Sequence, residues 1–164
     1  MKTTENNVMG LVPITQKTYG TVTADRQKEM SGLEFVQGLV EGALPLNTIA
    51  RTLGYDIVEV ASGRVVVTAV PNDAHLNPWG TVHGGLAATL LDSCMGLAIQ
   101  STLGKGVGST TLEFKISFIR PITPDTGPIK AEGKVISCGR RIAPRKDVSL
   151  TGTGAYSSTG RPLA

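Results

Sequence analysis

The stretch from residue 84 to residue 100 constrains the fold of this 164-residue chain more than any other. Its apolar residues cover most of the circumference of a helix, which is typical of a helix that is buried nearly all round. They are Leu86, Ala87, Leu90, Leu91, Cys94, Met95, Leu97, Ala98 and Ile99. Because other elements must enclose such a helix, we expect it to form the centre of the hydrophobic core.

Small or polar residues recur at helical spacing in this predicted helix, so they line up along one side of it as a seam. They are Gly85, Thr89, Asp92, Ser93, Gly96 and Gln100. Asp92 is the only charged residue of the helix. A buried carboxylate is unfavourable unless it is hydrogen-bonded, paired or used in chemistry. Asp92 is therefore either a satisfied structural aspartate that faces a cavity or an interface, or a functional group.

The residues before the helix favour the functional interpretation of Asp92. Residues 78–80 predict a turn, and His83 is followed by Gly84 and Gly85 where the helix should begin. Glycines allow another group to approach the backbone closely, and the free amides at a helix start attract negative charge. A carbonyl oxygen that becomes anionic during a reaction fits such a site.

The pattern N-x-x-G-x-x-H-G-G-x(6)-D resembles that of the hotdog-fold acyl-CoA thioesterases, specifically the phenylacetate-pathway-like (PaaI-type) branch. Here it is formed by Asn77, Gly80, His83, Gly84, Gly85 and Asp92. The likeness extends from about Ile49 to Ala143 and includes residues 108–121, which end in Arg-Pro. The resemblance implies an α+β hotdog fold, in which a curved antiparallel sheet wraps around a long central helix. It also implies hydrolysis of an acyl-CoA thioester.

The N-terminal half predicts short helices and a hairpin. Residues 1–30 show no periodic signal and are expected to form a flexible arm, followed by a single hotdog domain over 31–164. Ser31 and Glu34 form a capping-box pattern, which predicts an amphipathic helix that ends at Gly42. A half-turn is expected at 49–53. The β-rich runs at 55–61 and 64–71, separated by Ser62-Gly63, predict a hairpin.

Residues after the central helix predict the rest of the sheet. Alternation over 110–119 predicts a long strand. One face of this strand would carry Leu112, Phe114, Ile116 and Phe118. A second strand is expected at 129–137 and another from Cys138 onward. The tail departs from the family pattern after Pro144, so we expect a shortened or frayed sheet edge over residues 144–164.

The spacing of Gly84 and Asp92 makes a prediction about assembly. They are eight residues apart, which on a helix corresponds to about 12 Å along the axis. They therefore cannot both contact one thioester carbon. Two antiparallel central helices related by a two-fold axis would bring Asp92 of one chain toward Gly84 of the other. We expect a homo-oligomer, either a homodimer or a homotetramer, with its sites at the subunit interface.

Charge, together with the family pattern, predicts catalytic roles for several residues. Amides of Gly84 and Gly85 would polarise the thioester carbonyl, and Asp92 would attack it or activate a water molecule. Asn77 would either orient the water or the carbonyl, or hold its own loop through an Asx-turn. His83 would either donate to the thioester or, as we favour, cap the helix.

Thr111 matches a family position whose hydroxyl helps to place water, although Thr110 fits if the loop length differs by one residue. The alternative for Thr111 is an exposed strand threonine without a role. Three arginines are candidates for the coenzyme A phosphates: Arg120, Arg140 and Arg141. The alternative is that these arginines are solvated surface residues.

Composition and motif spacing argue against several other functions. The net charge of +3 is spread along the chain, and seven aromatic residues give little basis for nucleic-acid stacking. His75 and His83 do not stand at a spacing that is typical of metal ligands, so no metal site is expected. No other cofactor is expected either. Cys94 and Cys138 fit reduced thiols. The absence of a membrane-spanning or signal-type run predicts a cytoplasmic protein.

Two other functions share this fold. A non-catalytic hotdog module would bind acyl-CoA without turnover, because a fold does not dictate a function. A hydratase or dehydratase is less favoured, since those enzymes usually pair an acidic residue with a histidine on the same helix. Here His83 precedes the predicted helix and Asp92 lies within it.

Overall fold

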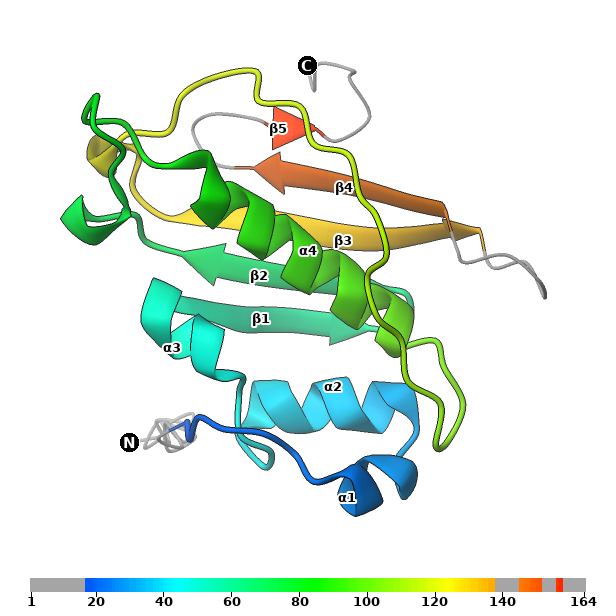
Figure 1. Cartoon of the computed structure of the whole chain (residues 1–164). Helices are drawn as coiled ribbons and strands as arrows, with labels where there is room; N and C mark the ends of the chain where they lie inside the picture. The colour runs from blue at the N-terminus through cyan, green and yellow to red at the C-terminus, as the bar shows by residue number, and fades with distance from the viewer. Residues whose placement is uncertain (1–16, 138–144, 152–155, 158–164) are drawn as a thin grey trace, which may run out of the picture.

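The structure is a computed structural model that describes residues 17–137, 145–151 and 156–157 (Figure 1). Within these residues, five strands form one sheet in the order β1-β2-β3-β4-β5, with every neighbouring pair antiparallel. The strands are β1 (Tyr55–Ala61), β2 (Arg64–Ala69), β3 (Ile129–Ser137), β4 (Arg145–Thr151) and β5 (Tyr156–Ser157). The predicted hairpin and the strand at 129–137 are confirmed.

The long helix α4 (Gly84–Gln100) crosses one face of this sheet, as the sequence predicted (Figure 1). Its residues Leu90, Leu91 and Cys94 are at most 2% exposed, and it packs mainly on β2 and β3. Gly133 of β3 marks the closest approach, because a Cβ there would lie 2.2 Å from the carbonyl oxygen of Cys94. The antiparallel sheet with its central helix gives the expected α+β arrangement.

Short helices precede the sheet. Helix α2 (Gly32–Glu41) begins with the predicted capping box of Ser31 and Glu34 and ends at Gly42, whose φ is 76°. Hydrogen bonds from Ser31 lower the pKa of Glu34. Helix α3 (Thr48–Leu53) fulfils the predicted half-turn, and Asn47 caps its start. The 3₁₀ turns η1 (Asp73–His75) and η2 (Pro124–Thr126) lie in the connections around α4.

Part of the predicted arm packs on the domain. Helix α1 (Ala24–Lys28) buries no residue, which explains why the sequence carries no apolar periodicity there. Tyr19 forms a bridge with Leu46, and Lys17 forms an ion pair with Asp56. Residues 1–16 lie outside the described part of the chain, and the domain boundary at residue 30 stays a prediction.

The predicted strand at 110–119 is wrong for the structure described here. These residues form no strand and pair with no neighbour within the described sheet. Leu112 is 91% exposed and Phe118 is 55% exposed, while Ile116 packs against the core. Alternation of side chains is a β-type pattern, but a strand also needs a neighbouring backbone to pair with.

The C-terminal edge differs in part from the expectation. Strand β4 begins at Arg145 and pairs with β3 along its length, so no fraying is seen there. Strand β5 has only two residues, which pair with β4. The strand expected from Cys138 and the interruption at Pro144 fall on residues 138–144, which lie outside the described residues.

The close contact at Gly133 leads to a stability prediction. Gly133→Ala forces a methyl group onto the Cys94 backbone, so it should lower the free energy of unfolding by about 3 kcal/mol or more, the upper end of overpacking effects. Urea denaturation followed by circular dichroism measures the change. Gly104→Ala is the matched control, because nothing lies within 4 Å of its Cβ position, and it should be neutral or slightly stabilising. Equal stability of the two variants would contradict this packing.

Candidate active site

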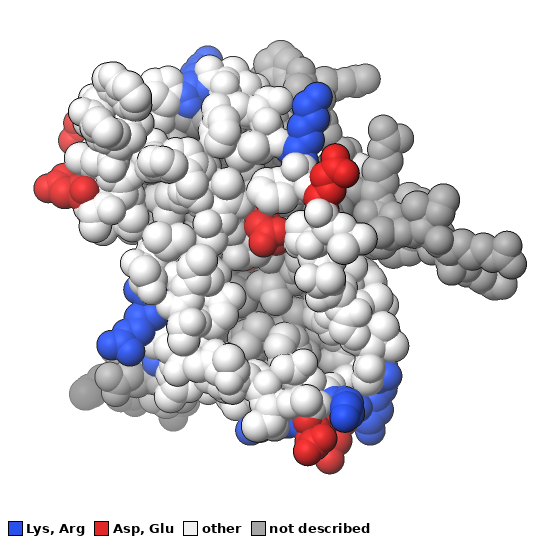
Figure 2. Space-filling model, in the orientation of Figure 1, with Lys and Arg blue, Asp and Glu red and all other residues white. Residues whose placement is uncertain are grey.

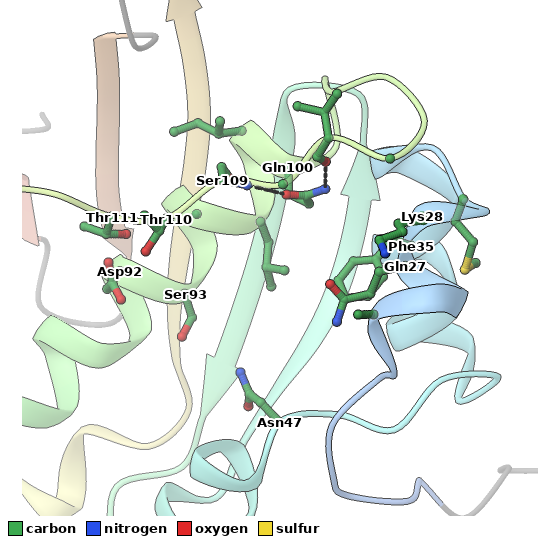
Figure 3. Close-up of a pocket in the computed structure, with 18 residues that line it drawn as sticks. Gln27, Lys28, Phe35, Asn47, Asp92, Ser93, Gln100, Ser109, Thr110 and Thr111 are labelled. Atoms are coloured by element: carbon green, nitrogen blue, oxygen red, sulfur yellow. Dashed lines mark hydrogen bonds between the residues drawn. The ribbon is translucent and has the colours of Figure 1, made fainter.

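A cavity of about 710 Å³ lies between α4, the segment after it, and the N-terminal helices. Figure 2 shows this face of the molecule hollowed near its centre, with Lys and Arg side chains mostly at its periphery. Asp92 and Thr111 both line the cavity, as does Thr110, and Figure 3 shows the two threonines beside Asp92. The structure therefore brings together two of the predicted catalytic residues.

Asp92 is half-buried, but one of its carboxylate oxygens is fully shielded. Oδ1 has no hydrogen-bond partner within the described part of the chain. An unpaired buried oxygen of a carboxylate is unfavourable, because it has lost water without gaining another donor. Within the described residues, the chain itself therefore does not satisfy Asp92.

Gln100 lies at the C-terminal end of the seam on α4. Its side chain binds the segment that forms the opposite wall of the cavity. Its Nε2 donates to the carbonyl oxygen of Val107 at 3.0 Å (Figure 3), and its Oε1 accepts from the backbone N–H of Ser109 at 3.1 Å. These bonds fix the segment that leads to Thr110 and Thr111. The Thr111 hydroxyl consequently faces Gly96 of α4, 4.0 Å from the position that a Cβ would take there.

A second cavity, of about 360 Å³, lies at the N-terminal end of α4. His83, Gly84 and Arg120 line it together with Phe118. The Phe118 ring lies against Gly84, where a Cβ would come within 3.0 Å of the ring atom Cζ. The Gly84 amide has no hydrogen-bond partner among the described residues. It is thus the free donor that the helix start offers to this cavity.

His83 caps α4 through its ring. Nδ1 accepts a hydrogen bond from the Gly85 amide at 2.9 Å, and the backbone N–H of His83 donates to the His75 carbonyl oxygen at 2.7 Å. A ring nitrogen that accepts a bond carries no proton, so the neutral ring holds its proton on Nε2. The cap agrees with the structural role that we favoured for His83. It also engages the Gly85 amide that was expected to meet substrate.

Asn77 is occupied within its own loop. Its Oδ1 accepts from the amides of Trp79 and Thr81 at 3.0 and 3.2 Å, and its Nδ2 donates to the Thr81 hydroxyl at 2.7 Å. Asn77 lines neither cavity described above. These contacts favour the loop-holding interpretation over a direct role in catalysis.

The remaining predicted residues divide into two groups. Arg120 borders the second cavity, next to the free amide of Gly84. Arg140 and Arg141 lie outside the described residues.

Cys94 is buried and free, and burial raises the pKa of its thiol to about 12, so it is no nucleophile at neutral pH.

The structure keeps Asp92 and Gly84 in different cavities of the same chain. Asp92 belongs to the cavity at the middle and C-terminal part of α4, and Gly84 to the cavity at its start. Their separation of eight residues along a straight helix corresponds to about 12 Å. Each chain thus carries two halves of a site that cannot act on one carbonyl together.

Sequence reasoning did not identify every residue of the first cavity. Asn47 lines it although it lies 45 residues before Asp92, and Phe35 reaches it from α2. Asn47 carried a recognisable signal only as an N-cap before α3. Gln100 was visible as a seam residue, but its contact to the following segment could not be inferred from spacing.

Comparison with known proteins agrees with this geometry. Residues 80–143 match the profile of the thioesterase superfamily. A phenylacetic acid degradation-related protein of Ralstonia eutropha JMP134 superposes with a TM-score of 0.65 and 28% identity, over 75% of this chain and 96% of that one. Residues 80–143 are therefore similar to the thioesterase superfamily, and the predicted hotdog fold and PaaI-type resemblance are confirmed.

Two further relatives bear on the chemistry. Human acyl-coenzyme A thioesterase 13 is 29% identical over 113 residues, which cover 68% of this chain and 79% of the relative. A hypothetical thioesterase of Streptococcus pneumoniae TIGR4, solved with coenzyme A, is 28% identical with a TM-score of 0.55, over 63% of this chain and 80% of that one. Both relatives support the predicted class of thioester hydrolase.

The match to other curated relatives is partial. The chain spans 41%, 59% and 65% of the lengths of relatives from Halobacterium salinarum, Caenorhabditis elegans and Saccharolobus solfataricus, at 30–38% identity. Within residues 17–137 and the described parts of the tail, no helix is long and apolar enough to cross a membrane, and no group of three metal-ligating side chains occurs.

The cap formed by His83 can be separated from any contact with substrate. Asparagine caps helices well, so His83→Asn should keep the stability of the protein, whereas His83→Ala should lower it by about 1 kcal/mol. Thermal and urea unfolding measure this difference. The rate of thioester hydrolysis by the folded His83→Asn protein then shows whether Nε2 of His83 contributes to catalysis. Activity close to that of the wild type is expected for a capping role, and an inactive but stable His83→Asn protein would show that the ring also acts on substrate.

Proposed function

We propose that the protein is an acyl-CoA thioesterase, which hydrolyses an acyl-CoA thioester to a free acid and coenzyme A. The observation that carries the proposal is the shielded, unpaired oxygen of Asp92 on an otherwise apolar helix, at the wall of a large cavity. A buried polar atom left without a partner in a folded protein calls for an explanation, and a catalytic role is one such explanation. The coenzyme A bound to the Streptococcus relative supports the substrate class.

The two half-sites are completed by a second copy of the chain. An antiparallel pair of α4 helices places the free Gly84 amide of one subunit beside Asp92 of its partner, and the two-fold axis generates two equivalent sites. Arg120 borders the half-site of Gly84, where its charge suits a coenzyme A phosphate. A homodimer is the smallest assembly that meets this requirement, and a homotetramer made of two such dimers meets it as well.

The charges that develop during hydrolysis are complementary to the Gly84 amide and the Asp92 carboxylate. The Gly84 amide, at the positive end of the α4 dipole, stabilises the oxyanion that forms on the thioester carbonyl. Asp92 either takes a proton from water, whose oxygen then attacks the carbonyl carbon, or attacks that carbon itself. The C–S bond breaks in both routes, and the departing thiolate takes up a proton. One water molecule is consumed in either case, directly or when the anhydride with Asp92 is hydrolysed.

Thr111 is positioned to assist this step. Its hydroxyl faces the seam of α4 in the cavity that contains Asp92, and Gln100 holds the segment that carries it (Figure 3). A hydroxyl there offers both a donor and an acceptor to a water molecule beside the carboxylate. The position of the Thr111 hydroxyl opposite Gly96 favours Thr111 over Thr110. Both threonines line the cavity, so both belong to the proposed site. A cytoplasmic location stays a prediction from the sequence.

Removal of the Asp92 charge tests the function directly. Asp92→Asn should reduce kcat/KM for acyl-CoA hydrolysis by at least about a thousandfold, equivalent to about 4 kcal/mol of barrier. Stability should not fall, since no hydrogen bond to Oδ1 is lost. Release of the free thiol, followed with a thiol reagent across short, long and aryl acyl-CoAs, measures the rate. The matched control is Asp125→Asn in η2, an exposed aspartate outside both cavities.

The same assay separates the main proposal from a non-catalytic alternative. If the wild-type protein binds acyl-CoAs but hydrolyses none across the panel, the protein is an acyl-CoA-binding module and the thioesterase proposal fails. Normal hydrolysis by Asp92→Asn would also overturn it.

Mixed assemblies test whether the sites are shared between subunits. Asp92→Asn and Gly84→Pro chains should each be inactive alone, because one lacks the acid and the other lacks the amide proton, while proline fits the first position of a helix. In a one-to-one mixture, random pairing leaves one intact site in half of the dimers, so about a quarter of the wild-type activity should return. Co-expression with two different affinity tags, followed by rate measurements, gives this value. Full activity of a monomer, or no recovery in isolated mixed dimers, would contradict a shared site.

A further inference from the structure

The segment before α2 covers one side of the large cavity. Four of its residues line the cavity, and they are Ala24, Gln27, Lys28 and Met30. Figure 3 shows Gln27 and Lys28 on one side of the cavity and Asp92 on the other. Residues 21–30, which we call the flap, therefore form the cavity wall that lies away from the carboxylate.

Both ends of the flap are anchored by short backbone hydrogen bonds. Before its start, the Gly20 amide donates to the Leu46 carbonyl oxygen at 2.9 Å, and the Leu46 amide donates to the Thr18 carbonyl oxygen at 2.9 Å. After its end, the Gly32 amide donates to the Leu103 carbonyl oxygen at 3.0 Å. These bonds hold the two ends on the domain, so any movement of the flap is confined to the residues between them.

The middle of the flap is held weakly. Its helix α1 buries no residue, and only Val22 and Met30, near the two ends, are partly buried against the core. The hydrogen bonds to neighbouring elements are long. Arg26 Nη2 donates to the Ala43 carbonyl oxygen at 3.5 Å, and the Gly106 amide donates to the Met30 carbonyl oxygen at 3.4 Å. Little contact is therefore lost when the flap moves away from the cavity.

The flap forms hydrogen bonds of its own that survive such a movement. The Gln27 amide donates to the Thr23 carbonyl oxygen at 3.0 Å, and Gln27 Nε2 donates to the Val22 carbonyl oxygen at 2.7 Å. The Met30 amide donates to the Gln27 carbonyl oxygen at 3.3 Å. An element with internal hydrogen bonds and few buried apolar contacts opens at a much lower free energy than the core does.

The flap also rests on the loop that leads to Thr111. Gly106, which donates to Met30, is followed by Val107, whose carbonyl oxygen accepts from Gln100 Nε2. The flap and α4 therefore bind neighbouring residues of one loop. In the closed form the cavity is enclosed by α4, this loop and the flap in turn.

We propose that residues 21–30 are a flap that opens to admit the acyl part of the substrate and closes over it before hydrolysis. The proposal rests on the acyl-CoA thioesterase function above and adds a conformational step to it. The structure shows the closed form. Closure separates the bound acyl group from bulk solvent, which is what lids over active sites generally achieve.

Trypsin measures the opening of the flap, because Arg26 and Lys28 lie in α1 and a protease cuts a helix only after it has opened. Octyl-CoA, a thioether that cannot be hydrolysed as a thioester, serves as the ligand. At about ten times its dissociation constant it should slow cleavage at both sites about tenfold, since it binds the closed form. Mass spectrometry of the digested full-length protein identifies each cut. Arg51 of α3, which does not line the cavity, is the control site, and its cleavage should not change.

A variant that weakens α1 tests whether the ligand leaves through the flap. Arg26 is exposed and does not line the cavity, and glycine in its place should make opening about fourfold more frequent. If release waits for opening, octyl-CoA should dissociate from Arg26→Gly about fourfold faster than from the wild type, as measured by surface plasmon resonance. Arg51→Gly makes the same change in α3 and should leave the dissociation rate unchanged.

These measurements distinguish the flap from the proposed function. Equal protection of Arg26, Lys28 and Arg51, or equal dissociation rates for the two glycine variants, would overturn the flap. So would equal protection by coenzyme A alone, because the flap would then not respond to the acyl part. If the wild type hydrolyses acyl-CoAs but shows none of these effects, the flap fails while the thioesterase function stands. If octyl-CoA protects the flap but no acyl-CoA is hydrolysed, the flap is supported and the thioesterase function fails.

Discussion

The enclosure of α4 by the sheet determines everything else in this structure. The helix is apolar on nearly every side, so it is stable only where another element covers it. Gly133 allows β3 to approach the backbone of α4 to a distance that no side chain would permit. This contact fixes the helix as a rigid axis. The carboxylate of Asp92 and the free amide of Gly84 are then held at a constant separation, each in its own cavity.

A rigid axis explains why the candidate site has two halves. Flexible loops adjust the distance between a base and an oxyanion donor, but two residues on one buried helix cannot approach each other. Chemistry that needs both must therefore use two helices. The proposed two-fold pairing of α4 solves this with a single interface.

The sequence predicted most of the local structure, because local signals were strong. The capping box at Ser31, the glycine at Gly42 and the apolar run of α4 each act over a few residues, and the structure confirms them. The segment 110–119 was predicted wrongly, since pairing depends on a distant neighbour that alternation does not specify. In the candidate site, Asp92 and Thr111 were expected together and do share a cavity. Asn47 and Gln100 could not be placed there, because their contacts depend on how α3 and the segment after α4 fold against the helix.

Asn47 links the shape of the cavity to the start of a helix. Its oxygen receives the amide of Ala50 and thereby begins α3, while its nitrogen, on the same planar group, faces the cavity. One residue therefore caps a helix and lines the cavity at once. A substitution at position 47 must still provide a residue that caps a helix. Few residue types do so, and this restricts how the cavity can change at this point. The lining of this cavity is consequently expected to change more readily during evolution at Phe35 or Met30 than at position 47.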